Sequence, residues 1–354
     1  MTARRQNLNL QRALQGLEKS IAAAVKDAIE KASFRIDEKA LIAAIDARDF
    51  SQIINLTRMN PAVLFPIEDA VRSGFIQGGG LVGGDLAAGL AGTYSFNGRH
   101  PEAEAWIRQH GAQLIDLITS EGIEAVRTVV EEGIASGRSS ASMAREITGR
   151  KVGNRRVGGI LGLNSDQAGH LQRARAILSD PAKIRQYFIR DEKTGRMKPR
   201  YKLSDRRFDR AIREAIRDGR AIRGKELDDI MAAHRSKALG YRGRVIAKNE
   251  SFSALAAGRA AGYEQLKDDP NVEKVTVRWQ HNLSQVPRED HVAMNGTVIE
   301  VGEFFQFDDA SMKHPHDPAG GAKHSIGCRC VAIYRAVMRR DNPVTAPTQG
   351  PQPA

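Results

Sequence analysis

The chain has 354 residues, enough for two or three domains of ordinary size. Hydrophobic residues make up 41% and charged residues 27%, which excludes a wholly disordered chain and a collagen-like fibre. Two cysteines exclude a disulfide-dense secreted scaffold. Aromatic residues account for only 5%, and this scarcity, together with frequent alanine runs, favours helices over a β-sandwich or a barrel.

The uncharged stretches give no sign of a membrane span or a secretion signal. Outside the proline-rich residues 342–354, the longest, 73–84 and 86–98, are glycine-rich and shorter than the roughly 20 apolar residues that a span needs. Residues 1–14 have no apolar core after their arginines, so they do not resemble a signal peptide. We expect a protein of a cytoplasm-like compartment without a membrane partner.

Positive charge is concentrated in one block of the chain. Residues 150–250 hold 27 Lys and Arg against 12 Asp and Glu, whereas the remaining 253 residues hold 27 against 30, so the net charge of +12 comes from this block. Such a block suits a polyanion, because each neutralised phosphate releases counterions, but it is also compatible with solvated helices that carry long basic side chains.

No sequence-reading motif accompanies this charge, so we expect contacts to the DNA backbone with little sequence preference. The residues expected to make them are Arg155, Arg156, Arg206, Arg207 and Arg210.

Residues 1–100 are expected to form a helical region that includes a glycine-rich connection. Apolar residues recur at helical spacing over 8–34, and Asp37 can cap a second helix over 38–47. A third helical region ends near residue 77. The segment 78–92 that follows lacks the Gly-Lys-Ser/Thr ending of a phosphate loop, so we interpret it as a flexible or closely packed connection.

Residues 101–270, which contain the basic block, are expected to form a helical body. A long helix is predicted over 103–135, and Ser139 or Ser140 can cap the next one. A basic, glycine-rich loop spans 149–165 and ends in a capping box formed by Asn164 and Gln167. The same periodicity predicts helices over 205–218 and 225–239, and a long helix ending near Leu266.

The pattern changes in residues 271–340, which we expect to form a small α+β or β-rich closing domain. Apolar residues alternate from Val275 to Trp279, as in a strand, and Asn295-Gly296 is typical of a hairpin turn that Arg288 and Asp290 would brace. The strand candidates are 275–279, 297–299 and 328–334. The proline-rich residues 341–354 are expected to be disordered. The predicted fold is therefore mainly α: an elongated multi-helix body followed by this domain.

The order of several motifs is typical of a known family. The segment 243–266 reads GRVIAKNESFSALAAGRAAGYEQL, and upstream lie ITSEGIEAVRTVVEEGIASGRSSASMAREI and RRVGGILGLNSDQAGHLQRARAIL. Downstream follow Trp279, the run Arg288, Glu289, Asp290 and His291, the turn Met294-Asn295-Gly296, then His324 and Gly327-Cys328-Arg329-Cys330. In this order the segments, over roughly 110–335, resemble the phage head morphogenesis family, the minor head proteins related to protein F of phage Mu.

This resemblance implies a minor structural protein of the head of a tailed phage or prophage. It implies the portal protein, the major capsid or scaffold protein and packaged double-stranded DNA as partners. It places the protein in the head interior near the portal, and in the host cytoplasm during assembly. The alternatives are an enzyme, a nuclease or transferase of a phage-derived toxin-like system, and a stand-alone nucleic-acid-binding protein. The sequence contains no paired carboxylates with a defined catalytic role, so we expect no enzymatic activity.

Histidines are concentrated between His281 and His324, and both cysteines follow. A set drawn from His291, His314, His316, His324, Cys328 and Cys330 has the imidazole and thiolate ligands that zinc prefers. We expect Cys328 and Cys330, on one face of a strand, to be completed by His324 and His291. The alternatives are two reduced cysteines that pack as small hydrophobic residues, or a disulfide, which is strained between residues i and i+2.

Overall fold

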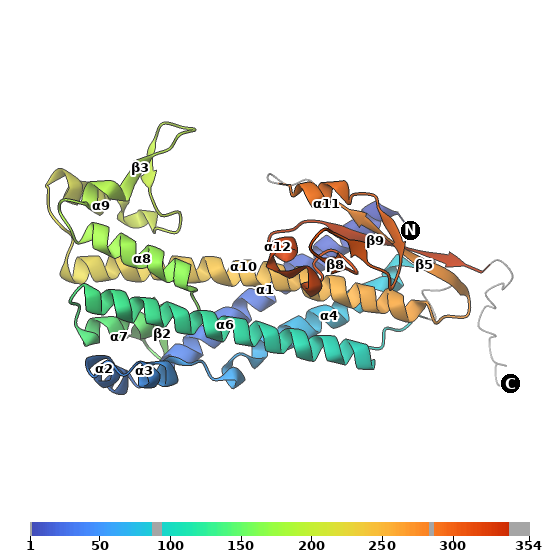
Figure 1. Cartoon of the computed structure of the whole chain (residues 1–354), viewed down its shortest axis with the longest axis horizontal. Coiled ribbons are helices and arrows are strands. Elements are labelled where there is room, and N and C mark those ends of the chain that lie inside the picture. Colours follow the sequence, from blue (N-terminus) through green and yellow to red (C-terminus); the bar gives the residue numbers. More distant parts are fainter. Residues whose placement is uncertain (1, 87–93, 283–286, 340–354) are drawn as a thin grey trace, which may run out of the picture. The chain divides into compact units, whose positions relative to one another are not determined.

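The computed structural model describes residues 2–86, 94–282 and 287–339 (Figure 1). The chain forms two compact units, each assembled from separate stretches of sequence. Unit 1 comprises Met1–Ala22, Glu68–Gly111 and Ile246–Ala354, and unit 2 comprises Ala23–Ile67 and Ala112–Val245. The predicted domains follow sequence order instead, with boundaries after residues 100, 270 and 340. The tail predicted to be disordered, 341–354, lies outside the described residues.

Helices form most of the described chain, and the two longest strands follow residue 271, which confirms the predicted mainly α fold with a β-rich carboxy-terminal part. The helices are α1 (Ala3–Phe34), α2 (Glu38–Asp46), α3 (Phe50–Thr57), α4 (Phe65–Asp85), α6 (Pro101–Ala135), α7 (Ser140–Thr148), α8 (Ser165–Leu178), α9 (Asp209–Arg217), α10 (Gly224–Leu266), α11 (Glu289–Ala293) and α12 (Gly321–Ser325). The strands are β1 (Arg150–Val152), β2 (Arg155–Val157), β3 (Phe188–Arg190), β4 (Met197–Pro199), β5 (Val272–Gln280), β6 (Val298–Glu300), β7 (Phe305–Gln306), β8 (Ser311–Met312) and β9 (Val331–Met338).

Several helices begin at the residues that the sequence predicted as caps. The Asp37 carboxylate accepts hydrogen bonds from two backbone N–H groups at the start of α2, and the Ser139 hydroxyl accepts one at the start of α7. Asn164 and Gln167 form the predicted capping box before α8. Caps satisfy N–H groups that have no partner within the helix, so these boundaries are set locally.

The prediction that 78–92 is a connection is wrong up to Asp85, because α4 continues through the first part of the segment. Residues 87–93 lie outside the described residues. The glycines here are needed for close helix packing: a Cβ on Gly78 would lie 2.5 Å from the Leu255 carbonyl oxygen on α10. The same holds for a glycine of α10: a Cβ on Gly258 would overlap the carbonyl oxygen of Phe75 on α4.

Three further predictions need correction. The helices expected over 225–239 and up to Leu266 are one continuous helix, α10. The basic loop expected over 149–165 contains the β1–β2 hairpin. A second hairpin, β3–β4, was not predicted, because each strand has only three residues, too few to show an alternating pattern, and the loop that joins them is mainly charged and polar.

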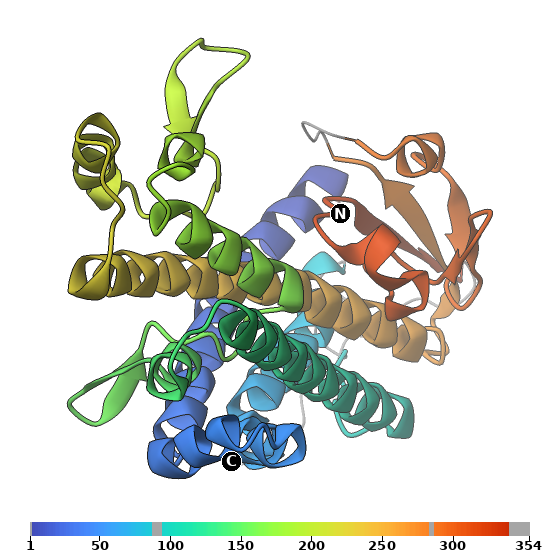
Figure 2. The ribbon, with the colours of Figure 1, turned by 60° about the vertical axis from the view of Figure 1, so that its left-hand side comes forward.

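A three-stranded antiparallel sheet, in the order β6-β5-β9, lies in unit 1 (Figure 2, orange to red). In β5, Val275, Val277 and Trp279 are buried, as their alternation predicted. Their core neighbours include Tyr263 of α10 and Phe305 of β7. The strand predicted over 328–334 begins only at Val331 and continues to Met338, so both cysteines precede it.

A buried guanidinium joins helices to this sheet within unit 1. Arg259 of α10 donates to Asp85 at 2.9 Å, to the side-chain oxygen of Gln6 at 3.0 Å and to the carbonyl oxygen of Ala332 at 3.2 Å. Gln6 also pairs with both backbone polar groups of Tyr334, at 2.8 and 3.0 Å. Because β9 is an edge strand of the sheet, these bonds satisfy backbone groups that would otherwise be free.

Unit 2 has its own buried charge network, centred on Glu146 of α7. The carboxylate accepts hydrogen bonds from Arg235 at 3.1 Å and from Gln172 at 3.0 Å, and it pairs closely with Arg138. Burial alone would raise the pKa of Glu146, but the charges of Arg235, Arg138 and Arg175 outweigh it and lower this pKa from 4.5 to about 2.

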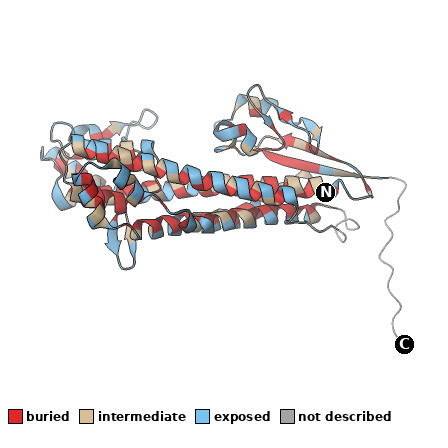
Figure 3. Cartoon of the chain, turned by 60° about the horizontal axis from the view of Figure 1, so that its bottom comes forward, coloured by how far each residue is buried: buried red, intermediate tan, exposed pale blue. Residues whose placement is uncertain are grey.

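Buried positions run as stripes along the helices, and exposed positions alternate with them (Figure 3). This is the pattern of amphipathic helices that pack against one another in water. Among the helices in the described ranges, none is both long enough and apolar enough to span a lipid bilayer.

The close packing of Gly258 against the Phe75 carbonyl of α4 predicts that alanine has different effects on stability at two glycine positions of α10. Gly258→Ala should lower the free energy of unfolding by about 1–3 kcal/mol, because the added methyl group has to displace the Phe75 carbonyl. Gly240→Ala on the same helix meets only the end of the Arg244 side chain and should stabilise the chain by about 0.5–1 kcal/mol. Denaturant unfolding followed by circular dichroism measures both. Equal effects at the two positions would refute the packing role.

The Glu146 network predicts a pH-dependent stability. Because the pKa of Glu146 is lowered by folding, its contribution is complete above about pH 4.5 and is lost as the pH falls towards about 2. Glu146→Gln should therefore be strongly destabilising at pH 7, and the difference from the unmodified chain should shrink by about 3 kcal/mol over this interval. Unfolding curves between pH 7 and pH 2.5 test this, with the exposed Glu131→Gln as the control. A pH-independent difference would contradict it.

Candidate metal centre and basic surface

Two cysteines and one histidine of unit 1 converge in a buried cluster. His291 Nδ1 lies 3.4 Å from Cys328 Sγ and 3.5 Å from Cys330 Sγ, and each of these residues is at most 3% exposed. The three ligand atoms all lie within 4.8 Å of one another. In a tetrahedral zinc site, sulfur and nitrogen ligands are about 3.6 Å apart, given their usual bond lengths to the metal. The cluster therefore has the composition and spacing of part of a zinc site.

His324 is in the same cluster but faces the other nitrogen of His291. The two rings are stacked at 6°, and His291 Nε2 lies 3.0 Å from His324 Nδ1. Since the two nitrogens of one imidazole point in different directions, an ion bound at Nδ1 would lie away from His324. The structure thus brings together all four predicted metal residues, but it puts only Cys328, Cys330 and His291 around one point.

His324 connects His291 to an acidic group at the surface. Its Nε2 lies 3.0 Å from the Asp309 carboxylate, which also accepts a hydrogen bond from Lys323. The bonds from Lys323 and His324 lower the pKa of Asp309 to about 2. Such a chain fixes the orientation of the His291 ring, as carboxylates behind metal-binding histidines do.

The two thiols differ in their electrostatic environment. Interaction with Cys330 lowers the pKa of Cys328, burial opposes this, and His291 and His316 reinforce it. The same pairing raises the pKa of Cys330. One thiolate is therefore stabilised by its neighbours in the cluster, in agreement with the need of metal ions for deprotonated sulfur.

The expectation that a strand presents both cysteines on one face is wrong. Cys328 and Cys330 lie in the segment before β9, where the Cys330 N–H points back to Cys328 Sγ at 3.3 Å. This turned backbone, rather than strand alternation, brings the two sulfur atoms to the same histidine. Both cysteines are free in this structure.

The predicted hairpin at Asn295-Gly296 is also wrong, because a helix, α11, precedes the turn and carries His291 into the cluster. Gly296 has φ of 90°, and its N–H donates to the Trp279 carbonyl at 2.8 Å, which leads the chain from α11 into β6. Arg288, expected to brace the hairpin, instead donates to the Ile326 carbonyl at 2.6 Å. It thereby holds the segment that leads to Cys328.

One face of α10 supports the loops of this cluster. Asn249 accepts a hydrogen bond from the Gly327 N–H at 3.2 Å, and the Ser253 hydroxyl donates to the His316 carbonyl at 3.2 Å. The Phe252 ring stacks on the His316 ring with centroids 4.6 Å apart. These residues belong to the segment 243–266 that carries the family resemblance, so the motif helix positions the cysteine- and histidine-bearing loops.

Glu250 of the same segment also has a structural role. Glu250 lies 2.6 Å from His110 Nε2 on α6, and Trp106 stacks on the His110 ring with centroids 4.5 Å apart. Sequence reasoning did not assign these contacts, since nothing in the local pattern around Glu250 indicates its partner.

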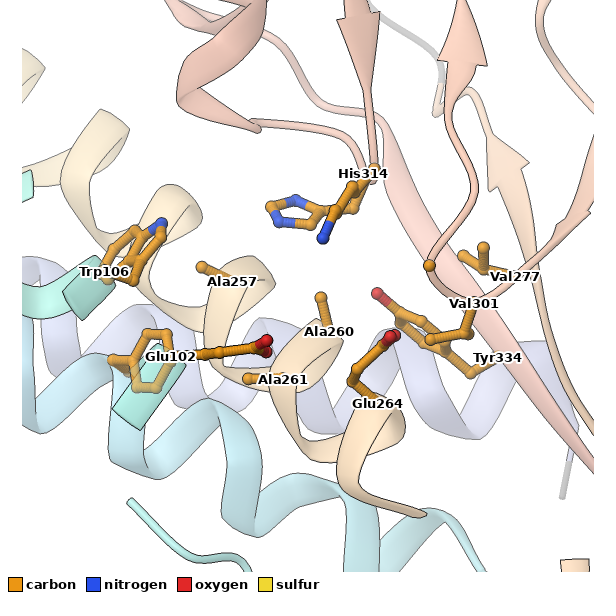
Figure 4. Close-up of a pocket in the computed structure, with 13 residues that line it drawn as sticks. Glu102, Trp106, Ala257, Ala260, Ala261, Glu264, Val277, Val301, His314 and Tyr334 are labelled. Atoms are coloured by element: carbon orange, nitrogen blue, oxygen red, sulfur yellow. The ribbon is translucent and has the colours of Figure 1, made fainter. Parts of the chain in front are cut away.

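A small pocket of unit 1 opens between α6, α10 and the loops before β9 (Figure 4). Its volume is about 160 Å³. Glu102, Glu264, His314 and the Tyr334 ring lie around it in Figure 4. Its lining includes none of the four predicted metal residues, so it is separate from the cluster.

The five arginines predicted to contact DNA are in different environments. Arg155, Arg206, Arg207 and Arg210 have side chains between 60% and 90% exposed. Arg156 is 10% exposed and donates to Glu38 at 2.7 Å and to Thr148 and the Gly149 carbonyl, so its guanidinium is used within unit 2. The alternation of β2 separates these neighbours: Arg155 faces solvent and Arg156 does not.

The exposed positive charge is concentrated in a narrower segment than the predicted block. Residues 185–225 contain 15 Lys and Arg and 6 Asp and Glu, and all 15 basic residues are exposed. Further along the block, Arg235 is buried against Glu146, and Arg242 pairs with Glu121. We call residues 185–225, which include the β3–β4 hairpin and α9, the basic segment.

Comparison with known proteins supports the resemblance drawn from the sequence. Residues 206–333 match the family model of phage Mu protein F like proteins, which confirms the predicted family over that stretch. A stretch of 81 residues is 37% identical to a protein named "Uncharacterized protein YqbB" of Bacillus subtilis (strain 168), and covers 22% of this chain and 26% of that protein. The chain thus spans about a quarter of the length of this relative. No solved structure matches the chain.

Proposed function

Because residues 206–333 belong to the phage Mu protein F like family, we propose that the chain is a minor structural protein of a tailed-phage or prophage head. It would act at the portal and in the capsid interior during head formation, DNA packaging or ejection. Its partners would be the portal protein, the major capsid or scaffold protein and packaged double-stranded DNA. The observation that carries this proposal is the family match over α10 and the closing region, whose motif residues hold that region together.

The geometry of unit 1 favours a structural role over an enzymatic one. The thiol–imidazole cluster is the best candidate for chemistry among the described residues, and both of its thiols are at most 3% exposed. A nucleophilic cysteine needs access to its substrate. We therefore propose that the closing region serves assembly rather than catalysis.

The basic segment supports contact with DNA. Its positive charges are exposed, on a hairpin and on a short helix. Exposed positive charge attracts a polyanion without a binding site shaped for one particular ligand. Arg206, Arg207 and Arg210 each pair with a nearby acidic residue, at 2.6–2.9 Å. Such exposed pairs are weak and can exchange their carboxylate for a phosphate.

The proposal predicts that the chain is a component of the virion head. Mass spectrometry of purified particles, with heads and tails separated, should detect it in proheads or mature heads in few copies per particle. The major capsid protein serves as the abundance reference. Absence from both proheads and mature heads would refute this role, and would leave the stand-alone nucleic-acid-binding alternative.

The second prediction concerns DNA binding by the basic segment. The triple variant Arg206→Ala, Arg207→Ala, Arg210→Ala should bind duplexes of unrelated sequence more weakly and to the same extent. The slope of log Kd against log salt concentration should fall by up to about 2.7, or about 0.9 for each phosphate that the variant no longer neutralises. Fluorescence anisotropy over a salt series measures both quantities.

The matched control removes the same number of charges from another exposed surface, with Arg4, Arg5 and Arg12 of α1 changed to alanine. It should change the salt slope much less. Equal weakening in the two triple variants would show that the basic segment is not the binding surface.

A further inference from the structure

The buried cluster at His291 provides three ligand atoms with close to tetrahedral spacing but no obvious fourth. His291 Nδ1, Cys328 Sγ and Cys330 Sγ meet at one point, from α11 and from the segment before β9. A structural zinc site is normally closed by four protein ligands. His324 is turned towards His291 Nε2 and already bonds to Asp309, so its two nitrogens are occupied.

His316 is the remaining buried imidazole beside these thiols. It is 2% exposed, and neither of its ring nitrogens has a hydrogen-bond partner in the described part of the chain. His316 and Cys330 line the same small cavity, so this imidazole lies beside the thiol pair. A buried imidazole without partners costs free energy, which a bound cation would recover.

The backbone at His316 is fixed in an uncommon conformation. Its φ is 65°, in the left-handed region that residues other than glycine rarely adopt. Two contacts with α10 hold it there: the Ser253 hydroxyl bonds to its carbonyl, and Phe252 stacks on its ring. Strained backbone held in place by its surroundings is frequent at ligand sites.

We propose that unit 1 binds one zinc ion through His291 Nδ1, Cys328 Sγ, Cys330 Sγ and the His316 imidazole. Two thiolates and two imidazoles are the soft and intermediate ligands that zinc prefers in tetrahedral sites. His316 is not among the residues whose ligand atoms all lie within 4.8 Å of one another, so binding draws its ring towards the thiols. This inference does not depend on the proposed role in the phage head.

In this site His324 is a positioning residue rather than a ligand. With an ion on His291 Nδ1, the proton of that ring is on Nε2, which donates to His324 Nδ1, and His324 Nε2 in turn donates to Asp309. This chain fixes the ring that presents Nδ1 to the ion. The ion would link three segments that are separate in the sequence: α11, the turn at His316, and the segment before β9 that contains Cys328 and Cys330. Binding energy at such a site becomes folding energy.

Zinc content of the full chain, prepared without a histidine tag, gives the first test. We expect one zinc per chain, and a fall in melting temperature when a chelator removes it that zinc restores. The unmodified protein is used here, so the result does not depend on whether any variant folds. A content far below one, with a melting temperature that neither chelator nor zinc alters, would overturn the proposal.

Trp279 provides a local reporter of binding, because its ring packs edge-on against His291 with centroids 5.3 Å apart. In a Trp106→Phe background, Trp279 is the single tryptophan left. Cobalt(II) added to the metal-free chain should quench its emission and produce thiolate charge-transfer absorption with the ligand-field bands of a tetrahedral ion. Titration without either change would contradict a site at His291.

Three histidine variants distinguish the fourth ligand from its neighbours. His316→Asn should weaken zinc binding by more than about 100-fold and alter the cobalt ligand-field bands, because it removes a ligand. His324→Asn should weaken binding by about 10- to 100-fold and leave those bands unchanged. The exposed His170→Asn, a control for adventitious binding, should change neither. If His316→Asn matches the control, His316 is not the fourth ligand and the assignment fails.

Discussion

The buried guanidinium of Arg259 is the interaction on which the candidate metal site depends. Moving a charged group out of water costs several kcal/mol, so Arg259 is stable only with all its partners present: Asp85, Gln6 and the carbonyl of Ala332. Ala332 lies two residues beyond Cys330. The ion pair therefore fixes the start of β9 against α10, and the same helix holds the loops on the other side of the cluster through Asn249 and Ser253. Charge burial at one point of α10 thus helps to position the segment that carries the thiols.

Local physics explains which parts of the fold could be predicted from the sequence. The cap at Asp37 and the capping box at Asn164 depend only on residues within four positions of each other, so the local sequence is sufficient to predict where these helices begin. The glycines of α4 show the limit of this reasoning. A glycine suits a loop and a close helix contact equally well, and the choice is decided by Gly258, which lies some 180 residues away.

The candidate site shows the same division. Residue type and order were enough to select Cys328, Cys330, His324 and His291 as neighbours. The structure places the two cysteines and His291 around one point, with His324 at the other nitrogen of His291. The order of residues could not indicate which nitrogen of His291 faces the thiols, because that depends on the path of α11, a helix that the sequence analysis did not predict. The sequence likewise could not distinguish His316 from His324. Both are histidines close to the cysteines in the chain, and only the backbone turns that carry them decide which ring lies beside the thiols.

A net charge describes the whole chain, but phosphate binding depends on where each charge is placed. Arg235 compensates Glu146 in the core of unit 2, and Arg156 joins α2 to the β1–β2 hairpin, so neither charge is free for DNA. The basic segment keeps an excess of nine basic over acidic residues, all exposed and partly paired with local carboxylates. A phosphate has to compete with these carboxylates, which makes each contact weak and sensitive to salt. Weak contacts without sequence preference would let DNA move past the protein, which fits the role in the phage head proposed above better than a role that requires holding a single sequence.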